Sequence, residues 1–196
     1  MSDRITVAID GMGGDNAPSI IVNGIGIAAK SNPDVKFLLF GDERQILPLL
    51  ERYPMAKAVC ETRHTTDFVT NDDKPTAALR GAKNSSMRLA INAVADGEAT
   101  AVVSAGNTGA LMAIATIVLK TLPGISRPAI ASSFPTQSGD SVMLDLGANV
   151  ECDANNLVQF AVMGQVYARN ELGLKQPSIG ILNVGVEGLK GNDSVK

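Results

Sequence analysis

The sequence has no tryptophan, and only 4% of its 196 residues are aromatic. Aromatic platforms on which single-stranded nucleic acids stack their bases are therefore not expected. The formal net charge of −3 also means that the chain as a whole does not attract a polyanion such as DNA or RNA. These deficits argue against a nucleic acid partner, and they require any phosphate chemistry to be local.

Histidine and cysteine are scarce as well: the chain has one histidine, His64, and two cysteines, Cys60 and Cys152. A histidine-based triad would need His64, but its polar segment contains no other catalytic pattern, so a surface or hydrogen-bonding role is the simpler interpretation. Neither cysteine lies in a glycine-rich turn beside a base or in a C-x-x-C motif, which leaves a covalent thiol mechanism unsupported and predicts reduced thiols. No metal-ligand spacing occurs, and we expect no metal and no cofactor.

Long apolar runs and nucleotide motifs are also missing. The longest apolar stretch, Leu111–Leu119, is far shorter than the roughly 18 residues that a membrane-spanning helix needs. The glycines of residues 11–14 have the wrong spacing for G-x-G-x-x-G, and no G-x-x-x-x-G-K-[ST] occurs, so NAD and Walker-type nucleotide sites are unsupported. With no signal peptide at its start, the sequence predicts a soluble cytoplasmic chain.

What the sequence does contain is alternation between short apolar runs and longer segments of helical period. Its 45% hydrophobic content is enough for one α/β domain over residues 1–196, although two compact halves are possible. Helices are predicted from Pro18 at position N1 to Lys30, from a Ser85 or Asn84 cap to Ala95, and from an Asp153 cap to about Gly173. The predicted strands are Ile5–Asp10, Val35–Gly41, Ala58–Glu61, Ala101–Ser104, Ala129–Ser133, Val142–Leu146 and Ile179–Asn183. This pattern predicts a Rossmann-like, mostly parallel sheet with helices on both faces.

Ligands of such sheets bind at the carboxyl ends of the strands, so the turn SAGNTG after the Ala101–Ser104 strand is informative. A helix N-terminus offers free N–H groups and a partial positive charge. Gly106 and Gly109 carry no side chains that would block approach, and Ser104, Asn107 and Thr108 add neutral donors. The turn therefore predicts a pocket for a small anion or a developing oxyanion, although a capped helix with a tight entry would explain the same residues.

Other strand ends repeat this chemistry of glycine, amide, carboxylate and cation. The turn DGMGGDNAP, residues 10–18, allows close backbone approach, although an ordinary tight turn is an alternative. The segment of residues 72–86 carries Lys74, Arg80 and Lys83, which could equally be a solvated basic face. The segments LDLGANVECD and NVGVEGLKGN also place polar groups after apolar strands, and each could be a loop that satisfies its own backbone.

These motifs carry a resemblance. DGMGGDNAP, DDKPTAALRGAKNSSM, VVSAGNTGALM, GISRPA, LDLGANVECD and NVGVEGLKG are similar, in this order, to the motifs of the bacterial phosphate acyltransferases that feed phospholipid synthesis. The resemblance runs from Ile5 to the last residue. It implies a fold like that of phosphotransacetylases and isocitrate or isopropylmalate dehydrogenases.

The activity that the resemblance implies is transfer of a fatty acyl group from acyl carrier protein to orthophosphate. It also implies a cytoplasmic homodimer with peripheral membrane contact, and a glycerol-3-phosphate acyltransferase as the downstream partner. The candidate catalytic residues are Asn107, Lys190, Glu187, Asp10 and Asp145. The candidate phosphate- or substrate-binding residues are Gly13, Gly14, Asp15, Arg80, Lys83, Ser104, Gly106, Thr108, Gly109, Arg127, Asn149 and Asn183.

Two departures from the family pattern and two alternatives accompany this interpretation. Val186 and Gly188 flank Glu187 where the family often has further acidic residues, so Glu187 would act alone. Family members continue well past NVGVEGLKGN, so we expect an N-terminal portion of a longer chain. The alternatives are a phosphotransacetylase that acts on a short-chain acyl-CoA, and a non-catalytic acyl- or anion-binding regulator.

Overall fold

The computed structural model describes residues 5–137, 139–147, 149, 151–185 and 190–191. The chain divides into two compact units, Met1–Lys120 and Thr121–Lys196, an arrangement that the sequence left open. At the boundary the backbone turns through left-handed conformations, with φ 64° at Lys120 and φ 87° at Gly124. Each unit is described by itself.

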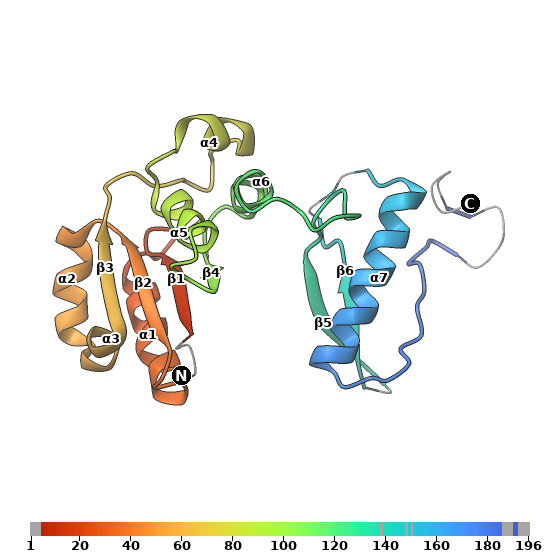
Figure 1. The fold of residues 1–196 in the computed structure, drawn as a ribbon, viewed down its shortest axis with the longest axis horizontal. Helices are drawn as coiled ribbons and strands as arrows, with labels where there is room; N and C mark the ends of the chain where they lie inside the picture. Colours follow the sequence, from red (N-terminus) through yellow and green to blue (C-terminus); the bar gives the residue numbers. More distant parts are fainter. Residues whose placement is uncertain (1–4, 138, 148, 150, 186–189, 192–196) are drawn as a thin grey trace. The chain divides into compact units, whose positions relative to one another are not determined.

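The first unit is built on a four-stranded sheet of β1 (Thr6–Asp10), β2 (Lys36–Gly41), β3 (Cys60–His64) and β4 (Ala101–Val103). The strand order is β3-β2-β1-β4, and every pairing is parallel (Figure 1). Ala8 of β1 pairs with Leu38 on one side and with Val102 on the other. Since all four strands run the same way, the polar turns that follow them leave from one edge of the sheet.

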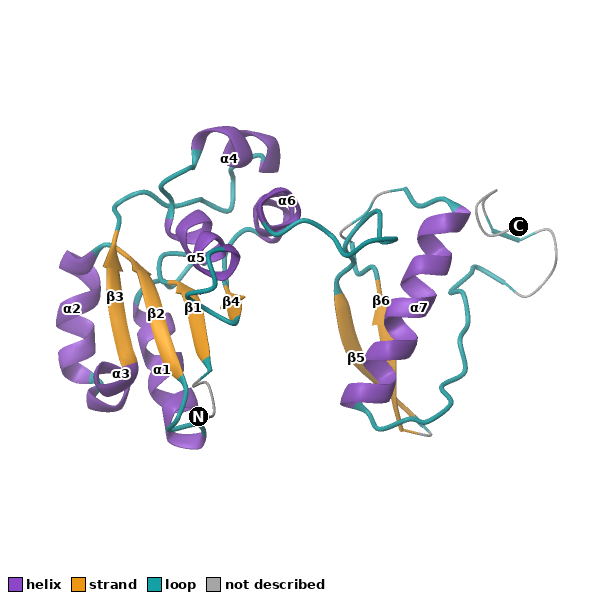
Figure 2. Cartoon of the chain, viewed as in Figure 1, coloured by secondary structure: helices purple, strands orange, loops and turns teal. Residues whose placement is uncertain are grey.

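Helices cover both faces of this sheet (Figure 2), because apolar residues occupy both faces of the central strands. Ile9 and Leu39 pack with α1 (Ser19–Ser31), α2 (Glu43–Arg52) and α3 (Pro54–Val59). Ala8, Leu38 and Phe40 point the other way and pack with α5 (Ser86–Ala95). The prediction of a parallel α/β sheet covered on both faces is confirmed.

A third apolar cluster joins α5 to α4 (Pro75–Gly81) and α6 (Thr108–Val118). Its buried members are Val69, Ala78, Met87, Ile91, Ala110 and Ile114. The cluster fixes the start of α6 and the start of α4 to the same support, close to the polar turns. Among the described helices, none is both long and apolar enough to cross a membrane.

The second unit contains the strands β5 (Ala131–Thr136) and β6 (Gly139–Leu144) and the helix α7 (Ala154–Glu171). The strands pair antiparallel, with Thr136 opposite Gly139, because so short a connection cannot make the crossover that parallel pairing needs. Asp153 caps α7 as predicted, in a capping box with Asn156. A Cβ at Gly164 would lie 2.9 Å from Cδ1 of Leu144, so α7 packs closely on β6.

Several predicted boundaries were wrong. The strand predicted to begin at Ala58 begins at Cys60. Residues 58 and 59 are the last residues of α3, which starts at Pro54. Pro18 is the N-cap of α1 and not its first helical residue. Residues 179–183 form no strand, because no described strand pairs with them, and apolar composition alone makes no ladder.

Substitution of Leu39 tests the assignment of the sheet core. Leu39 is fully buried in β2, whereas Leu47 on α2 is 47% exposed. We predict that Leu39→Ala lowers the free energy of unfolding by about 2–5 kcal/mol, because it removes buried methyl groups and leaves a cavity. Leu47→Ala is the matched control and should cost far less in urea denaturation. Equal losses for the two variants would contradict this core.

Candidate functional site

The site begins at a buried carboxylate. Asp10 is the last residue of β1, and its side chain is almost completely buried. Its Oδ1 accepts a hydrogen bond of 2.5 Å from Ser86 Oγ at the start of α5, and another of 3.3 Å from the backbone N of Met12. Its Oδ2 accepts one of 2.7 Å from Ser104 Oγ, just after β4. One carboxylate therefore joins the ends of two strands and the beginning of a helix.

Ser86 is the member of this network that is missing from the predicted site residues. It is fully buried, and Ser85 before it caps α5 by accepting a hydrogen bond from the N of Arg88. The signal in the sequence was a pair of hydroxyls at a helix start, of which one is a cap. Its partner Asp10 is 76 residues away along the chain, so only the fold brings the two together.

The glycines of the two turns lie against each other. A Cβ at Gly106 would lie 3.1 Å from Cα of Gly13, and one at Gly14 would lie 2.8 Å from the carbonyl oxygen of Ala105. Gly14 also has φ 97°, a conformation that favours glycine. These three glycines therefore let the turn after β1 pack directly on the turn after β4. The space beside these glycines is occupied by backbone and, at Gly13, by the side-chain carboxylate of Asp10.

The side chain of Asn107 is engaged at both ends. Its Oδ1 accepts a hydrogen bond of 3.0 Å from the N of Ala110 and so caps α6, as predicted for a helix that starts at this turn. Its Nδ2 donates to the carbonyl oxygens of Thr70, Asn71 and Asp73 at 3.1, 3.3 and 2.9 Å. In this structure Asn107 therefore organises the site, and direct contact with a substrate stays a prediction.

Asp15 is exposed and holds the same loop, because its Oδ1 accepts a hydrogen bond of 2.7 Å from Nδ2 of Asn71. Asp15 and Asn107 therefore hold the same segment, and no local pattern in the sequence connects that segment with either residue. Residues 70–73 lie between the turn after β1 and the start of α6.

Backbone donors are open at the start of α6. Thr108 and Gly109 are exposed, and within the described chain their backbone N–H groups donate no hydrogen bond. A Cβ at Gly109 would lie 2.8 Å from Cγ of Pro75, so this glycine allows α4 to approach α6. Arg80 and Lys83 are exposed on and just after α4, and neither makes an ion pair with a described residue.

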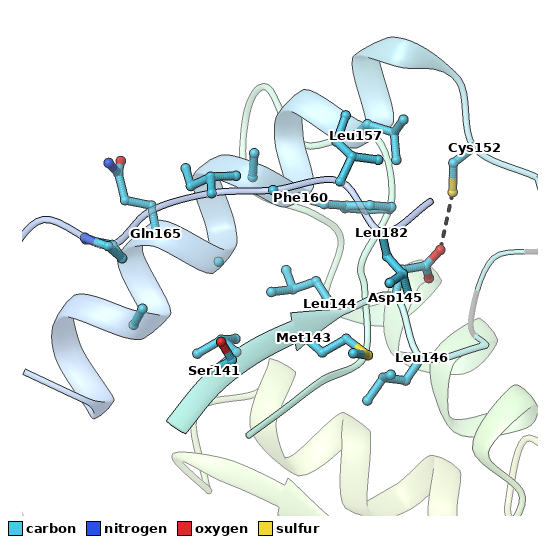
Figure 3. A pocket seen from close by; sticks show the side chains of 18 of the residues that line it. Ser141, Met143, Leu144, Asp145, Leu146, Cys152, Leu157, Phe160, Gln165 and Leu182 are labelled. Carbon is cyan, nitrogen blue, oxygen red and sulfur yellow. Dashed lines mark hydrogen bonds between the residues drawn. The ribbon is translucent and has the colours of Figure 1, made fainter. Parts of the chain in front are cut away.

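The second unit gathers Asp145, Asn149 and Arg127 around one loop. Asp145 has φ 66°, which is rare for a residue other than glycine, and its Oδ1 accepts from the N and Nδ2 of Asn149 at 3.2 and 2.8 Å. Its Oδ2 accepts from Sγ of Cys152 at 3.3 Å (Figure 3). Arg127 donates from Nη1 to the carbonyl oxygen of Glu151 at 3.1 Å. The Asp145 carboxylate fixes this loop as Asp10 fixes the turns of the first unit.

An open groove of about 1670 Å³ runs beside this loop. Figure 3 shows Leu144, Leu157, Phe160 and Leu182 among its lining side chains. Asn183 directly follows the lining residue Leu182 in the chain. Its Nδ2 donates a hydrogen bond of 3.3 Å to the carbonyl oxygen of Lys190. Glu187 lies outside the described residues.

Neither cysteine is set up as a nucleophile. Burial raises the pKa of the Cys60 thiol to about 12. Burial, the hydrogen bond to Asp145 and the charge of that carboxylate raise the pKa of Cys152. Because the thiolate is the reactive form, both thiols are held in their unreactive protonated state near neutral pH.

Comparison with known proteins places this geometry in a family. The model of a family described as "Fatty acid synthesis protein" matches residues 5–196. The chain is 62% identical over 196 residues to a phosphate acyltransferase of Rhodospirillum centenum, and 57% identical over 196 residues to that of Paramagnetospirillum magneticum. It covers 55% and 56% of these two proteins, so the chain spans about half the length of the curated relatives it matches.

Two solved structures share the fold. The EutD phosphotransacetylase from Staphylococcus aureus superposes with a TM-score of 0.59 at 19% identity, over 84% of this chain and 53% of its own. A phosphotransacetylase from Streptococcus pyogenes gives a TM-score of 0.56 at 18% identity, over 83% of this chain and 53% of its own. At these identities the likeness supports the α/β architecture and no particular chemistry.

Removal of the Asp10 carboxylate tests its role as the junction of the turns. We predict that Asp10→Ala lowers the free energy of unfolding by at least about 2 kcal/mol, because each buried hydroxyl left without its acceptor costs about 1–3 kcal/mol. Ser86→Ala should cost less in the Asp10→Ala background than alone. Asp34→Ala, at an exposed carboxylate, is the control for urea denaturation. An Asp10→Ala variant as stable as Asp34→Ala would contradict the network.

Proposed function

This chain belongs to the fatty acid synthesis protein family, and from that premise we propose that it forms part of an acyltransferase that transfers a fatty acyl group to orthophosphate. The product is an acyl phosphate for phospholipid synthesis. The supporting observation is similarity over all 196 residues of this chain, at 62% and 57% identity, to proteins named phosphate acyltransferase. We further propose acyl carrier protein as the acyl donor, which rests on the resemblance of the motifs.

The reaction needs no nucleophile from the protein. An oxygen of orthophosphate attacks the thioester carbonyl carbon, a C–O bond forms, and the C–S bond breaks. The carrier's sulfur leaves with the bonding electron pair and takes up a proton to become a thiol. The raised pKa values of both cysteines are consistent with direct transfer, since neither thiol is poised to form an acyl-enzyme.

The protein's task is then to bind phosphate and to stabilise the oxyanion that develops on the carbonyl. The open N–H groups of Thr108 and Gly109 stand at the N-terminus of the 11-residue helix α6, where the helix dipole favours an anion. Arg80 and Lys83 supply positive charge from α4 and the residues after it. The Asp10 network holds the two glycine turns fixed, which keeps these donors preorganised.

The remaining parts of the proposal rest on the family resemblance. They are a cytoplasmic homodimer, peripheral contact with the membrane, and delivery of the acyl phosphate to a glycerol-3-phosphate acyltransferase. Asp145, Asn149, Arg127, Asn183 and Lys190 of the second unit are proposed as further catalytic or substrate-binding residues, as is Glu187.

A second candidate is a phosphotransacetylase acting on a short-chain acyl-CoA. It is favoured by one observation, the shared fold with two phosphotransacetylases at TM-scores of 0.59 and 0.56. This candidate uses a different acyl donor, acyl-CoA. Because CoA contains a nucleotide, such an enzyme must also have a nucleotide pocket. The third candidate, a non-catalytic acyl- or anion-binding regulator, would bind phosphate without turnover.

An assay of the native protein with palmitoyl-acyl carrier protein and orthophosphate separates these candidates. We predict that acyl phosphate forms without NAD, ATP or added metal. Arg80→Ala and Lys83→Ala should each raise the KM for phosphate by roughly tenfold, because a hydrogen bond from a charged group is worth about 1.5–3 kcal/mol.

The matched control is Lys30→Ala, at the C-terminal end of α1 and therefore at the opposite edge of the sheet, which should leave the KM unchanged. Faster turnover with acetyl-CoA than with the carrier protein would favour the phosphotransacetylase. Phosphate binding with no turnover of either donor would favour the regulator.

A further inference from the structure

The amide of Asn107 lies inside a turn of another segment. Its Nδ2 is within 2.9–3.3 Å of three backbone carbonyl oxygens, those of Thr70, Asn71 and Asp73. A primary amide has two N–H groups, so three acceptors share its whole donor capacity. The same side chain uses its oxygen to cap α6. Asn107 is thus a clip with one end on α6 and the other on residues 70–73.

The segment that the clip holds runs from Thr70 to Lys83, and we call it the strap. Its apolar support is Val69 just before it and Ala78 within it, both buried against Ala110 and Ile114. Between these two apolar contacts the strap is held by polar ones. These are the clip from Asn107 and the hydrogen bond from Asn71 to Asp15.

The strap carries three cations and the two exposed carboxylates of Asp72 and Asp73, so its formal charge is positive by one. Lys74, Arg80 and Lys83 are exposed, and none of them makes a side-chain hydrogen bond or ion pair within the described part of the chain. Pro75 follows Lys74 directly and lies against Gly109, where a Cβ would come within 2.8 Å of its ring. The start of α4 is therefore pressed against the start of α6, beside the open N–H groups of Thr108 and Gly109.

We infer that Asn107 is a positioning residue: its amide fastens the basic strap to the N-terminus of α6, and so fixes the strap's cations beside the helix-end donors for phosphate. This inference rests on the proposed function. It gives Asn107 a different task from the direct contact with phosphate or oxyanion that the sequence predicted, because its donors are already used. The cations bind the anion, and Asn107 determines where they stand.

Two substitutions separate the clip from the helix cap. Asn107→Asp keeps a cap oxygen but turns an acceptor toward three carbonyls, and Asn107→Ser keeps a cap hydroxyl that is too short to reach them. Serine is neutral, so an effect common to both variants is not one of charge. Asn155→Asp is the control, because Asn155 is exposed in the first turn of α7 and its side chain makes no hydrogen bond with described residues.

Hydrogen exchange and steady-state kinetics of the native protein test the inference together. In both Asn107 variants, exchange in residues 70–83 should become roughly tenfold faster, because hydrogen bonds that hold the strap are lost. The KM for phosphate should rise by roughly tenfold while kcat changes by less than about threefold. Arg80→Ala should raise that KM much less in the Asn107→Ser background than in the unsubstituted protein.

Each outcome decides a different point. Unchanged strap exchange in both variants overturns the inference, whatever the activity. Faster exchange with an unchanged KM, or a full additional effect of Arg80→Ala in the Asn107→Ser background, overturns the positioning role. If the unsubstituted protein forms no acyl phosphate, the proposed function and the kinetic half of the inference both fail, and exchange alone still decides whether Asn107 fastens the strap.

Discussion

The structure of the first unit depends on one buried carboxyl group. A carboxylate inside a protein must receive hydrogen bonds, and Asp10 receives them from Ser86, Ser104 and the backbone of Met12. That requirement draws the start of α5 and the end of β4 to the end of β1. The turns after β1 and β4 are then so close that only glycine fits where they touch. Anything that these turns bind is bound by a rigid edge.

Preorganisation of this kind suits the proposed chemistry. Direct attack of phosphate on a thioester requires two reactants to be held and one developing charge to be stabilised, and fixed donors do this without reorganising during the reaction. The apolar cluster of Val69, Ala78, Ala110 and Ile114 lies under the same place and supports both α4 and α6. Core packing, the carboxylate network and the Asn107 clip therefore converge on the start of one helix.

The sequence predicted much of this fold, because period and capping are local properties. Short apolar runs indicated the four parallel strands, with the bounds of β3 misplaced, and Ser85 and Asp153 cap their helices as expected. What it could not provide were the partners. That Gly13, Gly14 and Gly106 bind a ligand stays a prediction. The sequence could not show that a Cβ at these positions would meet, in turn, the Asp10 carboxylate, the carbonyl oxygen of Ala105 and Cα of Gly13. Ser86 and the carbonyl groups of residues 70–73 were missed because contacts between distant segments have no local signature. Residues 179–183 look like a strand because composition does not reveal whether another strand pairs with them.

Phosphate is proposed to bind at the edge formed by the strap and the start of α6. Hydrogen exchange of the native protein, measured with and without saturating orthophosphate, tests it most directly because the readout is a location and needs no turnover. We predict slower exchange in residues 104–110 and 70–83, and little change in the outer helices α2 and α3. Protection confined to segments outside that edge, or no protection at a phosphate concentration that supports binding, would contradict it.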